Sequence, residues 1–380
     1  MIYLDNSATT KPYPEVMDTY RTVSEQYFAN PSSLHSLGGR SEQLLAQSRQ
    51  QAANLLGTDP SEIIFTSGGT EGNNLAIKGA AFAYRNRGKH LITTAIEHAS
   101  AANAFRQLEE LGFEVTYLPV DAEGRISFAD FKQAYRKDTI LVSVMHVNNE
   151  VGTIQPILEI GEFLKNLPTT VFHVDHVQGL SKVPLRLASS GIDLCTMSGH
   201  KIHGPKGTGI LYVKKGVLLS PLFAGGGQEA GHRSGTENLP GICGMVRALR
   251  LTKEKENEGR KRLLGLSGRL RRGLPTIPGA VIHTPVNGAA PHIINVSLNG
   301  IKSEVLVHAL EEQEIYVSTK SACSSKDSEA SSILLAMGTS RAEASQAIRI
   351  SMAYENTEEE IDSFLSVLDR VVRNLKMVMR

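Results

Sequence analysis

The chain has 380 residues, and 41% of them are hydrophobic, which is enough for a large core and for two domains. Lys and Arg number 40 against 39 Asp and Glu, so the sequence lacks the basic surplus of a protein that binds nucleic acid directly. No apolar run approaches the roughly 20 residues of a membrane span, and Asp5 lies where a signal peptide would be apolar. We therefore expect a cytoplasmic protein without a membrane segment.

Short runs rich in Val, Ile and Thr alternate with amphipathic helical patterns in the first part of the chain. Seven of these runs predict strands, at 62–67, 90–96, 113–120, 139–147, 169–177, 192–198 and 207–213. Such alternation is typical of βα units, so we expect an α/β fold whose mainly parallel, seven-stranded sheet is flanked by helices. Ligands of such sheets bind at the carboxyl ends of the strands, and the polar residues found there are the candidate site residues.

A different pattern follows this alternation. A long helical stretch ends in the charged cluster KEKENEGRKR (253–262), which we interpret as a solvated helix face. Beyond it, strand-like and helix-like runs predict a second segment of α+β type that closes with a C-terminal helix. We expect a large domain at 13–258 and a small α+β domain formed by 1–12 and 259–380.

The stretch FTSGGTEGNN (65–74) predicts the end of a strand, a glycine turn and the start of a helix. Backbone N–H groups at a helix N-terminus favour a phosphate, and Gly69 and Thr70 lie at that point. A tight turn capped by Thr70 explains the stretch equally well. His98 and Asn149 follow two other strands, where a structural histidine and a capped turn are the simpler interpretations.

Asp175 and Lys201 carry the strongest chemical signal. Asp175 ends an apolar strand, where a carboxylate is costly unless it is paired, and a protonated ring nitrogen would pair it. Lys201 lies between glycines next to a predicted strand end, where a lysine can lose its proton and form a Schiff base. Ser198 and His200 are candidate phosphate donors beside it. A helix cap at Asp175 and a surface lysine at 201 remain the alternatives for each residue alone.

These features occur in chain order on one predicted sheet: a phosphate turn, a strand-end carboxylate and a framed amine. Pyridoxal phosphate needs an anion site, a partner for its pyridine nitrogen and an amine for its aldehyde. The combination therefore predicts a pyridoxal-phosphate enzyme. Of the three cysteines, Cys195 and Cys243 lie in apolar runs, whereas Cys323 lies in the polar run TKSACSSKDSEASS (319–332), where a substrate can reach it.

The chain resembles the cysteine desulfurases, which are pyridoxal-phosphate enzymes of the class V aminotransferase group. The resemblance rests on YLDNSATT (3–10), NPSSLH (30–35), FTSGGTEGNN (65–74), EH (97–98), MHVNNEVG (145–152), DHVQ (175–178), SGHKIHGPKGTG (198–209), RSGTEN (233–238) and SACSS (321–325). These motifs span nearly the whole chain. The resemblance implies the fold of the type I pyridoxal-phosphate transferases.

The resemblance also implies a role for each matching residue. Lys201 would bind the cofactor covalently, Asp175 would pair with the pyridine nitrogen, and Gln178 with the ring hydroxyl. His98 would stack on the ring and also take part in catalysis. The implied phosphate ligands are Gly69, Thr70, Ser198 and His200, with Thr236 reaching the phosphate of a partner subunit in an obligate homodimer. The implied ligands of the substrate carboxylate are Asn149 and Arg349.

In the implied reaction, L-cysteine becomes L-alanine and its sulfur stays on Cys323 as a persulfide. An acceptor protein then takes the sulfur, either an iron–sulfur scaffold or a protein of tRNA or cofactor thiolation. No resident metal is implied. The sequence leaves open which acceptor is used and whether Cys323 ligates a transient iron–sulfur cluster on a scaffold.

Three alternatives remain at this point. Selenocysteine lyase, or another class V enzyme, would keep the cofactor and change the reaction. A metal-dependent hydrolase would use nitrogen and oxygen ligands such as His173, Asp175, His176, His200 and His203. A non-enzymatic interaction protein would not need so many polar residues at strand ends.

Overall fold

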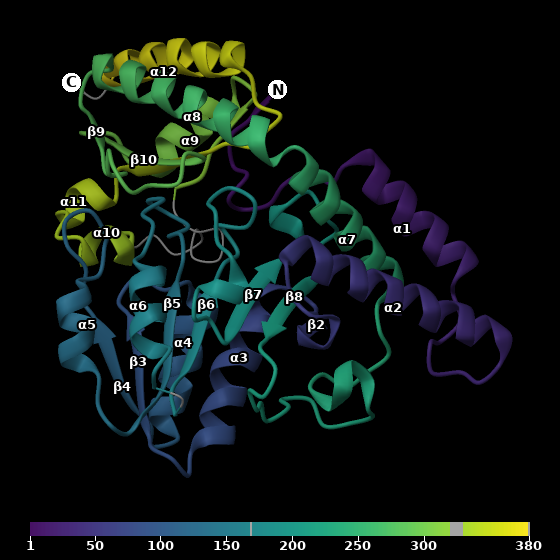
Figure 1. Ribbon diagram of the computed structural model, residues 1–380. Helices are drawn as coiled ribbons and strands as arrows, with labels where there is room; N and C mark the ends of the chain where they lie inside the picture. Colours follow the sequence, from purple (N-terminus) through teal and green to yellow (C-terminus); the bar gives the residue numbers. More distant parts are fainter. Residues whose placement is uncertain (168, 320–329, 379–380) are drawn as a thin grey trace.

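The computed structural model describes residues 1–167, 169–319 and 330–378. Figure 1 shows a larger unit built on a central sheet and a smaller unit that packs over one end of it. Cys323 lies outside the described residues. Within the described ranges, no helix has both the length and the apolar composition needed to cross a membrane.

The large sheet has seven strands, as the sequence predicts. They are β2 (Ile63–Thr66), β3 (His90–Thr94), β4 (Glu114–Leu118), β5 (Thr139–Met145), β6 (Val171–Asp175), β7 (Leu194–Ser198) and β8 (Gly209–Val213). Their order is β2-β8-β7-β6-β5-β3-β4. β8 runs antiparallel to both of its neighbours, and the other pairs are parallel. The prediction of a mainly parallel sheet is confirmed.

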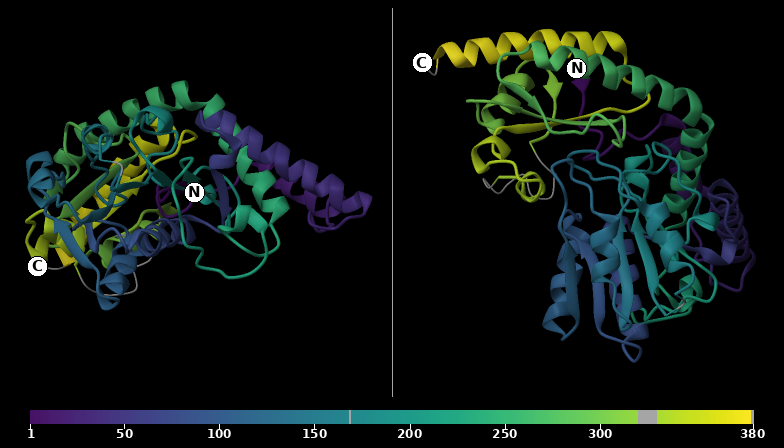
Figure 2. Two further views of the ribbon diagram at one scale, coloured as in Figure 1. Left: turned by 60° about the horizontal axis from the view of Figure 1, so that its bottom comes forward. Right: turned by 60° about the vertical axis from the view of Figure 1, so that its left-hand side comes forward.

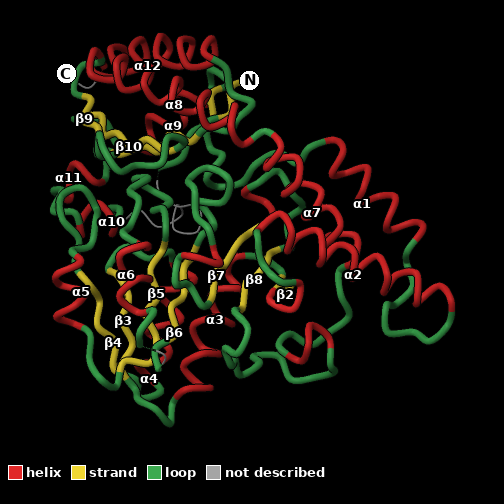
Figure 3. Tube along the Cα trace, in the orientation of Figure 1, coloured by secondary structure: helices red, strands yellow, loops and turns green. Residues whose placement is uncertain are grey.

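Each face of this sheet packs against its own helices (Figure 3). The helices of the large unit are α1 (Pro14–Gln26), α2 (Ser36–Leu56), α3 (Gly69–Tyr84), α4 (Ala99–Glu110), α5 (Phe128–Ala134), α6 (Ile157–Leu164) and α7 (Leu239–Glu254). Leu141 packs with α3 and α4, whereas the next residue, Val142, packs with α2, α5, α6 and α7. Because successive strand side chains point to opposite faces, strands buried on both faces become continuous apolar runs. For this reason the apolar runs in the sequence predict the strands.

The small unit is a three-stranded antiparallel sheet covered by helices (Figure 2). Its strands are β9 (Ala280–Ile282), β10 (Ile293–Leu298) and β12 (Ala347–Ser351), and β1 (Ile2–Tyr3) pairs with β11 (Ile315–Tyr316) beside it. Its helices are α8 (Glu256–Gly273), α9 (Ser303–Glu311), α10 (Ser332–Ala336), α11 (Arg341–Ala344) and α12 (Glu358–Val378). Short 3₁₀ turns lie at Pro60–Glu62, Leu187–Ser189, Gly199–Lys201, Gln228–Gly231 and Leu274–Thr276.

The long helical stretch ends in the cluster 253–262, as predicted, since the last residue of α7 is Glu254. A second helix, α8, begins at Glu256 and continues to Gly273, and the charge pattern did not predict it. Beyond the cluster, Leu263, Leu266 and Leu270 of α8 are buried in the core of the small unit. Such spacing places all three on one helix face.

The N-terminal segment contacts both units. Leu4 belongs to the apolar core of the small unit, whereas the backbone N–H of Thr10 donates to the carbonyl of His200 (2.9 Å) in the large unit. The division into a large domain at 13–258 and a small domain formed by 1–12 and 259–380 stays a prediction. This segment runs along the edge of the site described next.

Candidate active site

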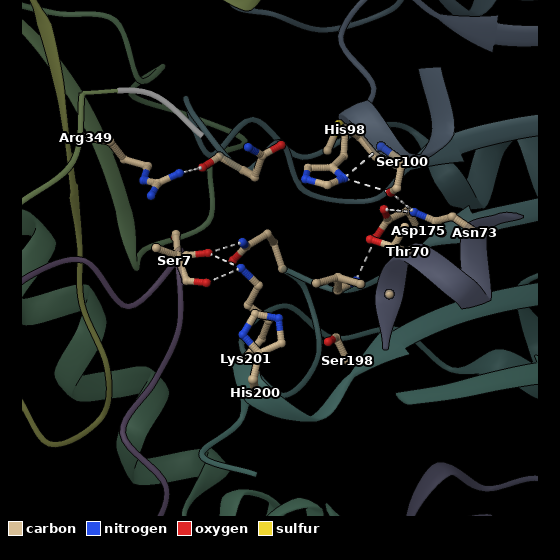
Figure 4. A pocket seen from close by; sticks show the side chains of 16 residues that line it. Ser7, Thr70, Asn73, His98, Ser100, Asp175, Ser198, His200, Lys201 and Arg349 are labelled. Carbon is tan, nitrogen blue, oxygen red and sulfur yellow. Dashed lines mark hydrogen bonds between the residues drawn. The ribbon is translucent and has the colours of Figure 1, made fainter. Parts of the chain in front are cut away.

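A cavity opens at the carboxyl ends of β6 and β7 and brings together residues from distant parts of the chain (Figure 4). Of the residues predicted from the sequence, it is lined by Gly69, Thr70, His98, Asn149, Asp175, Gln178, Ser198, His200, Lys201 and Arg349. Thr236 lines a different cavity, together with Ser67 and Arg233. Cys323 cannot be placed because it lies outside the described residues.

Lys201 enters this cavity from the 3₁₀ turn that follows β7. Its Nζ donates to the carbonyl oxygens of Ser7 and Ala8, the latter at 2.8 Å. The turn is compact because Gly199 passes close to Thr208: a Cβ at position 199 would lie 2.3 Å from Thr208 Oγ1. Glycine at that position is therefore required for the path that delivers Lys201 to the cavity.

Lys182 holds the same turn from behind. Its Nζ donates to the carbonyl oxygen of Lys201 at 3.1 Å. Lys182 is buried, and burial lowers the pKa of its ammonium to about 8. A buried lysine is therefore used to hold the backbone of Lys201. Sequence reasoning did not single out Lys182.

Asp175 lies at the end of β6 and is 5% exposed. Its Oδ2 accepts a hydrogen bond from Asn73 Nδ2 (2.7 Å), and its Oδ1 accepts one from the backbone N–H of Val177 (3.0 Å). These two hydrogen bonds fix the orientation of the carboxyl group at the cavity wall.

An anion cradle faces Lys201 at the N-terminus of α3. Gly68 precedes that helix with φ of 149°, a conformation that residues with a Cβ rarely adopt. The backbone N–H groups of the first helical turn have no partner within the helix and attract anions. Ser198 Oγ is buried and has no hydrogen-bond partner within the described chain. This unpaired hydroxyl and the open helix end fit a phosphate group.

His98 caps α4 and contacts the same network. Its Nδ1 accepts from the backbone N–H of Ser100 (3.2 Å) and lies 2.8 Å from Ser100 Oγ. Ser100 Oγ in turn accepts from Asn73 Nδ2 (2.9 Å), the amide that also holds Asp175. Asn73 therefore links the histidine and the carboxylate. Asn73 was not among the predicted site residues, although it lies three residues after Thr70 in the glycine-turn motif.

His200 stays neutral in this setting. Burial, followed by the charges of Lys201 and Lys206, lowers the pKa of its imidazole to about 4. Its Nδ1 lies 3.2 Å from Thr9 Oγ1. At neutral pH, His200 can therefore donate or accept a hydrogen bond but adds no positive charge to the cavity.

Arg349 lies on β12, in the small unit, and is 1% exposed. Its Nη1 donates to the carbonyl oxygen of Asn149 (3.1 Å), and its Nη2 forms an ion pair with Asp5 Oδ1 (2.8 Å). Its Nε is buried without a hydrogen-bond partner in the described part of the chain. The guanidinium thus retains a donor for a carboxylate.

The histidines proposed as metal ligands do not converge. His173 lies between Ser143 Oγ (2.8 Å) and Thr196 Oγ1 (3.0 Å), and His176 Nδ1 lies 2.8 Å from His146 Nδ1. Over the described ranges, no group of three or more His, Cys, Asp or Glu side chains could hold a metal ion. The geometry gives the hydrolase alternative no support.

The buried histidines predict a loss of stability in acid. Burial lowers the pKa of His146 to about 4 and that of His173 to about 3, so the unfolded chain binds more protons below pH 6.5. Between pH 6.5 and pH 5, each is expected to lower the free energy of unfolding by up to about 2 kcal/mol. The midpoint of urea unfolding, measured at both pH values, should therefore be lower at pH 5.

Glu97 has the opposite effect on the pH dependence of the free energy of unfolding, and it supplies the control. Burial raises the pKa of its carboxyl to about 8, so its contribution to stability is lost as the pH rises from 4.5 to 8. Glu97→Gln removes this partial offset, and the fall in the midpoint towards pH 5 should be steeper in the variant. A midpoint that is equal or higher at pH 5 in both proteins would show that the histidines are not buried as neutral groups.

Comparison with known proteins identifies the class. A family model described as Aminotransferase class-V matches residues 2–364. The chain therefore belongs to the class V aminotransferase family. The match spans both units of the fold, so it covers the turn that carries Lys201 and the strand that carries Arg349.

The relatives narrow the class to cysteine desulfurases. A "NifS/IcsS protein homolog" from Lactobacillus delbrueckii subsp. bulgaricus is 51% identical over 380 residues, which cover 100% of this chain and 99% of the relative. A "Cysteine desulfurase IscS" from Methanosarcina thermophila is 43% identical, over 99% of this chain and 93% of the relative. The resemblance predicted from the motifs is confirmed, and the similarity supports cysteine desulfurase activity.

Solved structures agree with this result. A structure titled "NIFS-LIKE PROTEIN" has a TM-score of 0.92 and 39% identity, and the match covers 98% of this chain and 99% of that one. Another, titled "SspA in complex with cysteine", has a TM-score of 0.82 and 34% identity, over 94% of this chain and 100% of that one. The predicted α/β fold is confirmed.

Proposed function

We propose that this cysteine desulfurase uses pyridoxal phosphate to convert L-cysteine to L-alanine and to transfer the sulfur as a persulfide on Cys323. The observation that supports this most directly is a single cavity that holds an amine, a strand-end carboxylate and an anion cradle. These are Lys201, Asp175 and the helix end at Gly69 and Thr70. Each of them matches one functional group of the cofactor.

The cofactor would be held by the cavity residues on all sides. Its aldehyde would react with Lys201, its pyridine nitrogen would pair with Asp175, and its ring hydroxyl would accept from Gln178. The phosphate would bind Gly69, Thr70, Ser198 and His200, and the ring would lie against His98. When bound, pyridoxal phosphate supplies an electron sink that stabilises negative charge at the substrate Cα.

Lys201 moves the proton. Its Nζ would remove the Cα proton of L-cysteine and become an ammonium. The carbonyl oxygens of Ser7 and Ala8 already accept from this Nζ, so they would hold the protonated form. The carboxyl group of Asp175 is held by Asn73 and by the backbone of Val177, and it would pair with the pyridine nitrogen.

Arg349 and Asn149 would orient the substrate through its carboxylate. The Cys323 thiolate then attacks the substrate sulfur. A new S–S bond forms as the Cβ–S bond breaks, and the electron pair stays with the carbon fragment. This fragment takes up a proton at Cβ, regains a proton at Cα from the Lys201 ammonium, and leaves as L-alanine. Cys323 keeps the sulfur as a persulfide until an acceptor protein, an iron–sulfur scaffold or a thiolation protein, removes it.

The partners and location belong to the same proposal. We expect a homodimer, in which Thr236 binds the phosphate of the partner subunit, because Thr236 lies outside the cavity that holds Lys201. We also expect a cytoplasmic enzyme without direct contact to nucleic acid. The acceptor would receive sulfur for iron–sulfur cluster assembly or for thiolation of tRNA or a cofactor.

Turnover of L-cysteine tests the proposed function. The purified protein, supplied with pyridoxal phosphate and a reducing thiol, should release L-alanine and sulfide in equal amounts. L-selenocysteine, measured in parallel, distinguishes a selenocysteine lyase, which would act on the selenium substrate and leave L-cysteine untouched. Absence of alanine from both substrates would refute the proposal.

A further inference from the structure

The N-terminal segment forms one wall of the cavity at Ser7. The backbone N–H of Ser7 donates to Ser351 Oγ (2.9 Å), and the backbone N–H of Ser351 donates to the carbonyl of Leu4 (2.7 Å). The backbone N–H of Ala8 donates to the carbonyl of Asp5 (3.0 Å), which closes a turn. Ser7 is thus fixed by its backbone, on the face of β12 from which Ser351 and Arg349 project.

The carbonyl oxygen of Ser7 already accepts two hydrogen bonds from side chains that line the cavity. It accepts hydrogen bonds from Lys201 Nζ and from Gln178 Nε2, the latter at 3.0 Å. The close-up shows Ser7 next to the end of the Lys201 side chain (Figure 4). Its position therefore depends on the same groups that serve the reaction.

The hydroxyl group of Ser7 has no such partner. Ser7 is 2% exposed, it lines the cavity, and its Oγ has no hydrogen-bond partner in any described residue. A buried hydroxyl without a partner is unfavourable, so one that persists at a ligand cavity indicates that the ligand supplies the partner.

The residues around Ser7 indicate which group of the ligand its hydroxyl would bind. Asp5, two residues earlier, holds Arg349 Nη2, while Arg349 Nε is buried without a partner in the described chain. Ser7 and Arg349 both line the cavity, and each has one buried donor without a partner in the described chain. Both can donate to one carboxylate.

We propose that Ser7 Oγ is a substrate-binding group that donates a hydrogen bond to the carboxylate of bound L-cysteine, next to Arg349. This assignment rests on the proposed function and adds to it a residue from the N-terminal segment. It explains why the backbone of Ser7 forms several hydrogen bonds while its buried hydroxyl has no partner in the described chain.

The test compares Ser7→Ala with the unchanged holoenzyme. A hydrogen bond to a charged group is lost, so KM for L-cysteine should rise about tenfold while kcat changes less than about twofold. Cysteamine lacks only the carboxylate, and its affinity, measured from the change it causes in the cofactor absorption, should be the same in both proteins. Ser7→Thr, which keeps a hydroxyl, should recover part of the loss in KM.

Ser181→Ala is the matched control. Ser181 Oγ is also buried without a partner in the described chain, but Ser181 does not line this cavity. Its replacement should leave KM for L-cysteine unchanged. The proposal is overturned if Ser7→Ala leaves KM unchanged, if it weakens cysteamine equally, or if it alters the cofactor absorption before substrate is added. If the enzyme without any substitution does not turn over L-cysteine, the proposed function is refuted instead.

Discussion

Replacing Lys201 with alanine is expected to lower the rate of alanine formation by at least about 10³-fold, because one side chain supplies both the covalent cofactor link and the proton transfer. The structure gives this residue the required setting: its Nζ reaches the cavity and is held by the carbonyls of Ser7 and Ala8. The assay is alanine release from L-cysteine with saturating pyridoxal phosphate. The visible absorption of the bound cofactor reports whether it is still covalently attached.

Lys214→Ala provides the control for this variant. Lys214 is half exposed and forms an ion pair with Asp193 (3.0 Å), away from the cavity. It should retain turnover and colour. If Lys201→Ala turned over L-cysteine at a rate similar to that of the unchanged enzyme, another amine would have to bind the cofactor.

Replacing Cys323 with serine is expected to abolish sulfur transfer and to leave the cofactor bound. The serine hydroxyl is a much weaker nucleophile towards sulfur than a thiolate, so the substrate Cβ–S bond should not break at a measurable rate. L-cysteine should still change the cofactor absorption, because binding does not use Cys323. The measurements are sulfide release and the persulfide mass on the peptide that contains residue 323.

Cys243→Ser is the matched cysteine control. Cys243 is buried and its Sγ lies 3.3 Å from Ser48 Oγ, so it cannot meet an acceptor protein. This variant should release sulfur normally. Full sulfur release by the Cys323 variant would assign the nucleophile to another group.

Most of the fold could be predicted because its strands are buried on both faces. β6 and β7 appear in the sequence as mainly apolar runs that end in Asp175 and Ser198, so their ends pointed directly to the site. Lys201 was equally visible, since it follows β7 within a glycine-rich turn. Local patterns of this kind carry both the strand and the chemistry at its end.

The remaining parts of the site depend on contacts between distant segments. Asn73 is recognised as a partner of Asp175 only when α3 is packed against β6, 102 residues away in sequence. The pairing of Asp5 with Arg349 spans 344 residues. No local pattern reports such contacts. For the same reason the helix α8 was missed, because its charged first turns hide the apolar residues Leu263 and Leu266 that pack into the core of the small unit.

Borohydride reduction of the holoenzyme, followed by mass spectrometry of its peptides, tests the central claim most directly. Reduction turns the bond between a lysine and the cofactor aldehyde into a stable amine. We predict that the added pyridoxyl phosphate mass is found on Lys201. A protein that stays colourless with pyridoxal phosphate and shows Lys201 unmodified, or one that carries the added mass on a different lysine, would contradict the account.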